Sequence, residues 1–197
     1  MAYLKVSEAR AAAQPTLARL QKSASGILKQ ESRSLDAAKT FDVFLSHSYQ
    51  DAEVILGVKA IMESLNLTVY VDWIDDSGLD RTKVTHKTAE ILRRRMRAAG
   101  CLVYAHSSNS GDSTWMPWEL GYFDGFKPAH LWILPIVSDY DSEFKSQEYL
   151  SLYPTVDKIS SLAGHINLGF TDAGVQKRDI PLVEAARGTG VYFTGTG

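Results

Sequence analysis

The sequence predicts an α/β protein built on a parallel β-sheet, and two patterns support this prediction. Short apolar runs suited to strands occur at 43–45, 67–72, 102–105 and 131–137. Segments whose apolar residues recur at helical spacing lie between them, at 54–65, 85–99 and 115–124. Strands and helices that alternate through short links are typical of parallel strands joined by right-handed crossovers.

Each element has its own local signal. The continuous apolar run at 43–45 suits a strand covered on both faces, and 67–72 is rich in β-branched and aromatic residues. The helix at 85–99 is expected to stop at Gly100, since glycine commonly ends helices. Residues 138–197 are less periodic, so the position of a fifth strand stays open.

The first 39 residues differ from the rest of the chain. They carry a net charge of +4 against −6 for the remainder, and an amphipathic helix of about 15 residues is expected after Pro15. The segment is either a helix packed on the domain or a loosely ordered tail, or it is an arm for self-association or partner docking. The first interpretation is favoured because such apolar stripes are usually buried. The chain is therefore divided into a helical extension at 1–39 and a domain at 40–197.

Composition excludes several classes of protein. A net charge of −2 over 197 residues argues against nucleic-acid binding, and the single cysteine, Cys101, cannot form a disulfide within the chain. Neither a signal peptide nor the roughly 18 apolar residues of a membrane span are found. The histidines lack zinc-ligand spacing. We expect a cytoplasmic protein without a bound metal and without a membrane partner.

Polar residues follow three of the predicted strands. Ser46, His47 and Ser48 come after the first strand, Trp73 after the second and His106 after the third. Ligands of open parallel sheets bind at the carboxyl ends of the strands, so these side chains should gather at one edge.

The turn at 46–48 leads directly into a helix. A helix N-terminus offers free N–H groups and suits a phosphate. From the residues alone, phosphate binding and ordinary turn chemistry fit equally well. Asp51, a few residues later, is interpreted as a helix cap.

Trp115 and Glu119 lie four residues apart and therefore share one helical face. A carboxylate against aromatic walls can stabilise an oxocarbenium ion or attack the anomeric carbon of a glycoside. From the residues alone, a Glu on the exposed side of an amphipathic helix is the competing interpretation.

The segment Phe-Asp-Val-Phe-Leu-Ser-His-Ser-Tyr-Gln-Asp at 41–51 and the segment Trp-Met-Pro-Trp-Glu at 115–119 together resemble the TIR (Toll/interleukin-1 receptor) domain family. The likeness covers about 40–160 and is greatest to bacterial members that break down NAD. It implies a flavodoxin-like fold, usually with five strands, and Glu119 as the catalytic residue. The loop at 73–84 then matches the family's BB loop, which gates the nucleotide site and takes part in contacts between domains. The residues expected to contact NAD are Ser46, His47, Ser48, Trp73, His106 and Trp115.

The resemblance implies an enzyme that cleaves the nicotinamide–ribose bond of NAD. The product would be ADP-ribose, a cyclic isomer or a conjugate, made in bacterial anti-phage defence. Nicotinamide leaves as a neutral group, so one carboxylate can suffice. Implied partners are NAD, other copies through TIR–TIR contacts, and an effector that senses the product. The alternatives are a non-catalytic TIR interaction module and a nucleoside-processing transferase of related fold; the 41–47 segment favours TIR over the latter.

Overall fold

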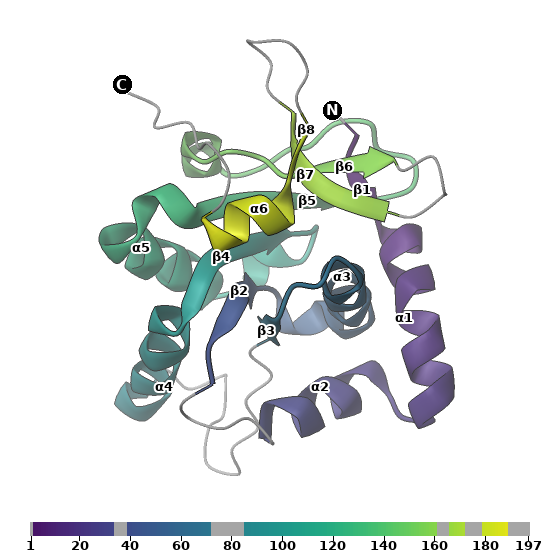
Figure 1. The fold of residues 1–197 in the computed structure, drawn as a ribbon, viewed down its shortest axis with the longest axis horizontal. Coiled ribbons are helices and arrows are strands. Elements are labelled where there is room, and N and C mark those ends of the chain that lie inside the picture. Colours follow the sequence, from purple (N-terminus) through teal and green to yellow (C-terminus); the bar gives the residue numbers. More distant parts are fainter. Residues whose placement is uncertain (1, 34–38, 72–84, 161–165, 172–178, 189–197) are drawn as a thin grey trace.

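The computed structural model describes residues 2–33, 39–71, 85–160, 166–171 and 179–188 of the chain. The predicted loop at 73–84, with Trp73, lies outside these residues. The central sheet has five parallel strands in the order β1-β5-β4-β2-β3 (Figure 1). These strands are β1 (Leu4–Lys5), β2 (Phe41–Ser46), β3 (Val69–Val71), β4 (Ala99–His106) and β5 (Leu131–Val137). The predicted parallel, flavodoxin-like α/β fold is confirmed.

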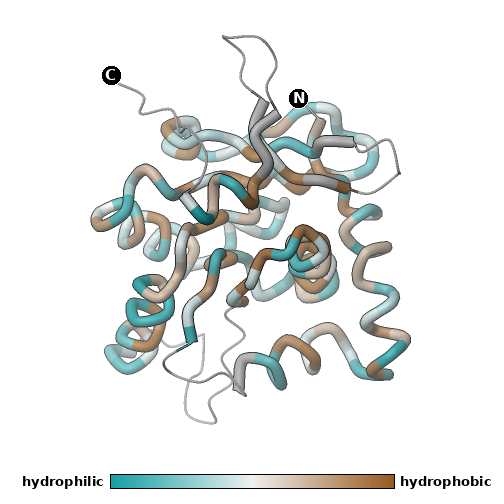
Figure 2. The backbone as a smooth tube through the Cα atoms, in the orientation of Figure 1, coloured by the Kyte–Doolittle hydropathy of each residue, from teal (hydrophilic) through white to brown (hydrophobic). Residues whose placement is uncertain are grey.

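Helices cover both faces of this sheet, and each face has its own apolar core. One core joins the sheet to α1 (Val6–Leu20), α2 (Ala24–Arg33), α3 (Ala52–Ser64) and α6 (Leu182–Arg187). The other joins it to α4 (His86–Arg97) and α5 (Met116–Phe126). Successive strand residues point to opposite faces, so Val43 and Leu45 enter the first core and Phe44 the second. Helix α3 carries many hydrophobic residues, as its buried position requires (Figure 2).

The fifth strand comes from the N-terminus of the chain. In β1, Leu4 pairs with Ile136 and Lys5 with Val137 of β5. The amphipathic segment that follows was predicted to begin after Pro15, and this was wrong, because α1 begins at Val6 and contains Pro15. A proline inside a helix removes one backbone hydrogen bond, and α1 is held in place by its packing on α3.

Packing of the N-terminal segment on the domain is confirmed at Gly57 of α3. A Cβ atom there would lie 1.7 Å from the backbone oxygen of Ala9, so α1 and α3 touch backbone to backbone. Lys158 also forms an ion pair with Glu8 of α1 at 2.7 Å. The domain boundary at residue 39 stays a prediction.

Gly100 was predicted to end a helix but lies inside β4. A Cβ atom at this position would come within 2.7 Å of the Ala186 oxygen and 2.9 Å of the Asp42 oxygen. The strand therefore needs a residue without a side chain where α6 crosses it. Cys101, the next residue, is fully buried, as predicted, and its thiol donates to the Asp42 oxygen at 3.2 Å.

The C-terminal region adds a second, antiparallel sheet of order β6-β7-β8. Its strands are β6 (Asp157–Ser160), β7 (Ile166–Thr171) and β8 (Asp179–Pro181). Just before β6, the Val156 N–H donates to the Ile133 oxygen of β5 at 2.7 Å. Residues 155–156 and β1 thus share one edge of β5. Among the described residues, no helix has the length and apolar character that crossing a bilayer requires.

Candidate active site

The candidate active site centres on a buried contact between Ser46 and Glu119. Ser46 ends β2, and Glu119 lies in the first turn of α5 above it. The Ser46 hydroxyl donates to Glu119 Oε2 at 2.5 Å, and both residues are 1% exposed. β2 and β4 are neighbours at the point where the strand order reverses, which is where open α/β sheets bind ligands. Ser46 and Glu119, which were predicted to gather at one edge of the sheet, are therefore in contact, and their roles in catalysis and NAD binding stay predictions.

Tyr104 lies near the Glu119 carboxylate, and Tyr149 lies beside Tyr104. Tyr104 pairs with Ser46 across β2 and β4 and points to the same face of the sheet. Burial raises the pKa of Tyr104, and both the neighbouring Tyr149 phenol and the Glu119 charge raise it further. The Tyr104 phenol therefore stays protonated at neutral pH and remains a hydrogen-bond donor beside the carboxylate.

Trp115 occupies the N-cap position of α5, one turn before Glu119. Its carbonyl accepts the Glu119 N–H at 2.8 Å. Its ring is 6% exposed and packs edge-on against Trp118 at 5.4 Å between centroids. In this arrangement the Trp115 ring belongs to the apolar core, and its contact with NAD stays a prediction.

The Ser-His-Ser turn is ordered by bonds within the turn. His47 is 2% exposed, and its Nδ1 lies 3.0 Å from the Leu45 oxygen. Ser48 accepts the Gln50 N–H at 3.4 Å and caps the short 3-10 helix Tyr49–Asp51. Contacts of His47 and Ser48 with a phosphate stay predictions.

Asp51 was interpreted as a helix cap, and the structure corrects its role. It occupies the N-cap position of α3 but forms no capping hydrogen bond there. Its carboxylate instead accepts the Ser107 hydroxyl and, at 2.6 Å, the Asn109 amide. Asp51 thus ties the turn after β2 to the loop after β4, which fixes two walls of the site.

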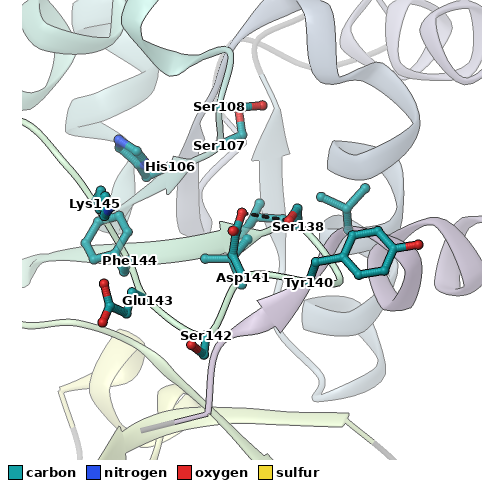
Figure 3. A pocket seen from close by; sticks show the side chains of 13 residues that line it. His106, Ser107, Ser108, Ser138, Tyr140, Asp141, Ser142, Glu143, Phe144 and Lys145 are labelled. Atoms are coloured by element: carbon teal, nitrogen blue, oxygen red, sulfur yellow. Dashed lines mark hydrogen bonds between the residues drawn. The ribbon is translucent and has the colours of Figure 1, made fainter.

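His106 ends β4 and faces a pocket of about 370 Å³ at the same edge of the sheet (Figure 3). Its ring stacks on Tyr104 at 6.4 Å and meets the Phe144 ring edge-on at 4.9 Å. Burial lowers the pKa of His106, and a hydrogen bond with Gln147 opposes the shift only in part. The imidazole is therefore neutral at physiological pH.

Sequence reasoning missed Tyr104, Tyr149 and the 138–145 segment that forms the pocket wall. The sequence could have predicted two of them, Tyr104 and residues 138–145. Tyr104 lies two residues before His106, so strand alternation places both on one face. Residues 138–145 directly follow β5, so the strand-end rule that selected His106 applies to them as well.

No cluster of three or more potential metal ligands occurs within the described ranges.

A parallel sheet with this strand order and a buried glutamate above its reversal point defines a TIR-like α/β protein. No protein-family model matches the chain. A protein of Bacillus cereus (strain MSX-D12) named "Probable 3' cyclic ADP-D-ribose synthase ThsB'" is 53% identical over 137 residues, which cover 69% of this chain and 70% of that protein. A candidate cyclic ADP-D-ribose synthase of Cytobacillus dafuensis, TIR2, is 36% identical over 93 residues, or 47% of this chain and 24% of that protein. The chain therefore belongs to the TIR-domain family, among its bacterial members.

Proposed function

We propose that this protein cleaves NAD between nicotinamide and ribose and closes the remaining ADP-ribose into a cyclic isomer. The observation that carries the proposal is the Ser46–Glu119 pair at the strand reversal point. The chain's relationship to a protein named as a 3′ cyclic ADP-D-ribose synthase supports the cyclic product.

The reaction begins when the bond between the anomeric carbon and the nicotinamide nitrogen breaks. The electron pair of that bond goes to nicotinamide, which leaves neutral, and positive charge develops on the ribose. The Glu119 carboxylate stabilises this charge, and its orientation is fixed by the Ser46 hydroxyl at 2.5 Å. A charge that is positioned before the reaction costs no reorganisation at the transition state.

The 3′ hydroxyl of the adenosine ribose then attacks the anomeric carbon. A carbon–oxygen bond forms, and the hydroxyl proton is released. If water attacks instead, the product is ADP-ribose. The ratio of the two products depends on which hydroxyl the site holds against the anomeric carbon.

Because Glu119 is buried, activation of the enzyme requires a conformational change around it. At 1% exposure, its carboxylate meets NAD only after the groups around it move. We propose that self-association through TIR–TIR contacts, involving the 73–84 loop, accompanies this opening. Specific activity should then rise with protein concentration. Rates strictly proportional to protein over a hundredfold range would contradict the role of assembly.

The proposed biological role is signalling in bacterial anti-phage defence, with an effector that senses the cyclic product. The family membership supports this role.

The test is incubation of the purified protein with NAD over a range of concentrations. Chromatography measures nicotinamide, and mass spectrometry separates the cyclic product from ADP-ribose, which is heavier by one water. Nicotinamide release with a cyclic product is expected. Absence of release under every assembly condition would favour a TIR interaction module without turnover.

A further inference from the structure

The pocket beside His106 has no role in the proposal above. It opens at the carboxyl ends of β4 and β5, and its floor includes Ile136 and Val137. Residues 138–145 form its far wall (Figure 3). Its volume of about 370 Å³ falls within the range of small-molecule sites, roughly 300–1,000 Å³.

We propose that this pocket holds the adenosine half of NAD, with the Asp141 and Glu143 carboxylates accepting the ribose hydroxyls. The proposal deepens the proposed function, because it names where the attacking half of the substrate binds.

The polar side chains of the wall fit a hydroxyl-rich group. Among the described lining residues, the Asp141 and Glu143 carboxylates accompany one cation, Lys145. The Lys5 ammonium adds a second cation, since it donates to the main-chain oxygens of Ser138 and Asp141 in this wall. The two carboxylates suit ribose, whose hydroxyls are commonly bound by an Asp or Glu in NAD sites. Asp141 already accepts the Ser138 hydroxyl at 2.6 Å, which orients it and leaves further lone pairs for a ligand.

Aromatic rings in the same pocket fit an adenine base. Phe144 is held edge-on to His106 at 4.9 Å. Tyr140 is 99% exposed at the rim, so its ring is available for a base. Stacking on an aromatic side chain stabilises a bound base of any sequence identity.

The position of the pocket explains how a cyclic product could form. His106 lines the pocket and stacks on Tyr104 at 6.4 Å, and Tyr104 lies within the electrostatic influence of Glu119. The Tyr104–His106 pair therefore links this pocket with the surroundings of the Glu119 carboxylate. NAD whose two halves reach both places is folded back on itself, which brings the adenosine half towards the half that loses nicotinamide.

Adenosine 5′-monophosphate is the probe, and its binding to the full chain is measured by titration calorimetry. The test variant is Asp141→Asn/Glu143→Gln, in which both carboxylates become isosteric amides. The control is Asp112→Asn/Glu148→Gln, which removes two exposed charges outside the pocket. We expect the dissociation constant to rise about tenfold in the test variant, since hydrogen bonds to charged acceptors are stronger than those to neutral ones, and to stay unchanged in the control.

The direction in which the dissociation constant changes distinguishes hydrogen bonding to the ribose from simple charge repulsion of the probe. If the carboxylates only repel the anionic probe, their neutralisation tightens binding, and the proposal is overturned. Adenosine 2′,5′-bisphosphate gives a second measurement. It should bind the native protein more weakly than the monophosphate, because its 2′-phosphate meets the carboxylates, and the difference should shrink in the test variant.

The proposal is also overturned if the native protein does not bind the monophosphate at millimolar concentration. Failure of the proposed function is a separate result, since it is measured as nicotinamide release. Binding of the probe with the expected loss in the test variant supports the adenosine site even in a protein that releases no nicotinamide.

Discussion

Replacement of Glu119 by Gln separates catalysis from folding at this site. The amide has the size of the carboxylate, and its oxygen can still accept the Ser46 hydroxyl that now lies 2.5 Å from Oε2. The variant therefore keeps the hydrogen bond and loses only the charge. Loss of that charge removes the group that stabilises the ribosyl cation.

The two expected effects differ strongly in size. A charge-assisted hydrogen bond contributes about 1.5–3 kcal/mol and a neutral one about 0.5–1.5 kcal/mol. The unfolding free energy should therefore fall by about 1–2 kcal/mol at most, partly offset because Glu119, at 1% exposure, no longer buries a charge. For a chain of this length the melting temperature should shift by about 8 °C or less. Turnover should fall at least about a hundredfold, which corresponds to about 2.7 kcal/mol of transition-state stabilisation.

The assay is nicotinamide release from NAD at the protein concentration at which the native enzyme is most active, with thermal melts of each variant. Glu148→Gln, an exposed carboxylate on the 3-10 helix Glu148–Leu152, serves as the control and should match the native protein in both measurements. A Glu119→Gln variant that melts normally and turns over NAD at the native rate would remove Glu119 from the mechanism.

Three further changes have defined outcomes. Gly57→Val places side-chain atoms against the Ala9 backbone and should lower the melting temperature by about 5–10 °C. The control Gly125→Ala, where a Cβ meets no atom within 4 Å, should leave the melting temperature unchanged. Equal melting temperatures of the two variants would refute the close contact. Burial raises the pKa of Asp42, but its hydrogen bonds to Thr68 and Arg187 outweigh this and lower it overall. The contribution of the Asp42 carboxylate to folding stability is therefore complete above its unfolded pKa near 4 and is lost as pH falls through its folded pKa. Between pH 7 and pH 3, the melting temperature of Asp42→Asn should fall less than that of the native protein. Ser46→Ala should reduce turnover about tenfold or more, because the buried carboxylate loses a donor; unchanged kinetics would show that another group orients it.

The sequence by itself determined the α/β class and most of the central sheet. β5 was predicted at its observed bounds, 131–137, because a continuous apolar run between turn signals has few alternatives to a buried strand. The strand-end rule also placed Ser46 and His106 at one edge. The pairing of Trp115 with Glu119 in one helix followed from their spacing alone.

Only the tertiary structure decided how these pieces meet. The fifth strand, Leu4–Lys5, is two residues long and carries no periodic signal, so its place beside β5 depends on contacts 132 residues away in sequence. Asp51 has the local pattern of a helix cap, yet its carboxylate binds Ser107 and Asn109, because a side chain takes the donors that folding brings near. Trp115 shares a helical turn with Glu119, but its ring is buried in the apolar core. Local pattern specifies elements and faces, whereas pairing, burial and the final partner of each polar group arise from residues distant in sequence.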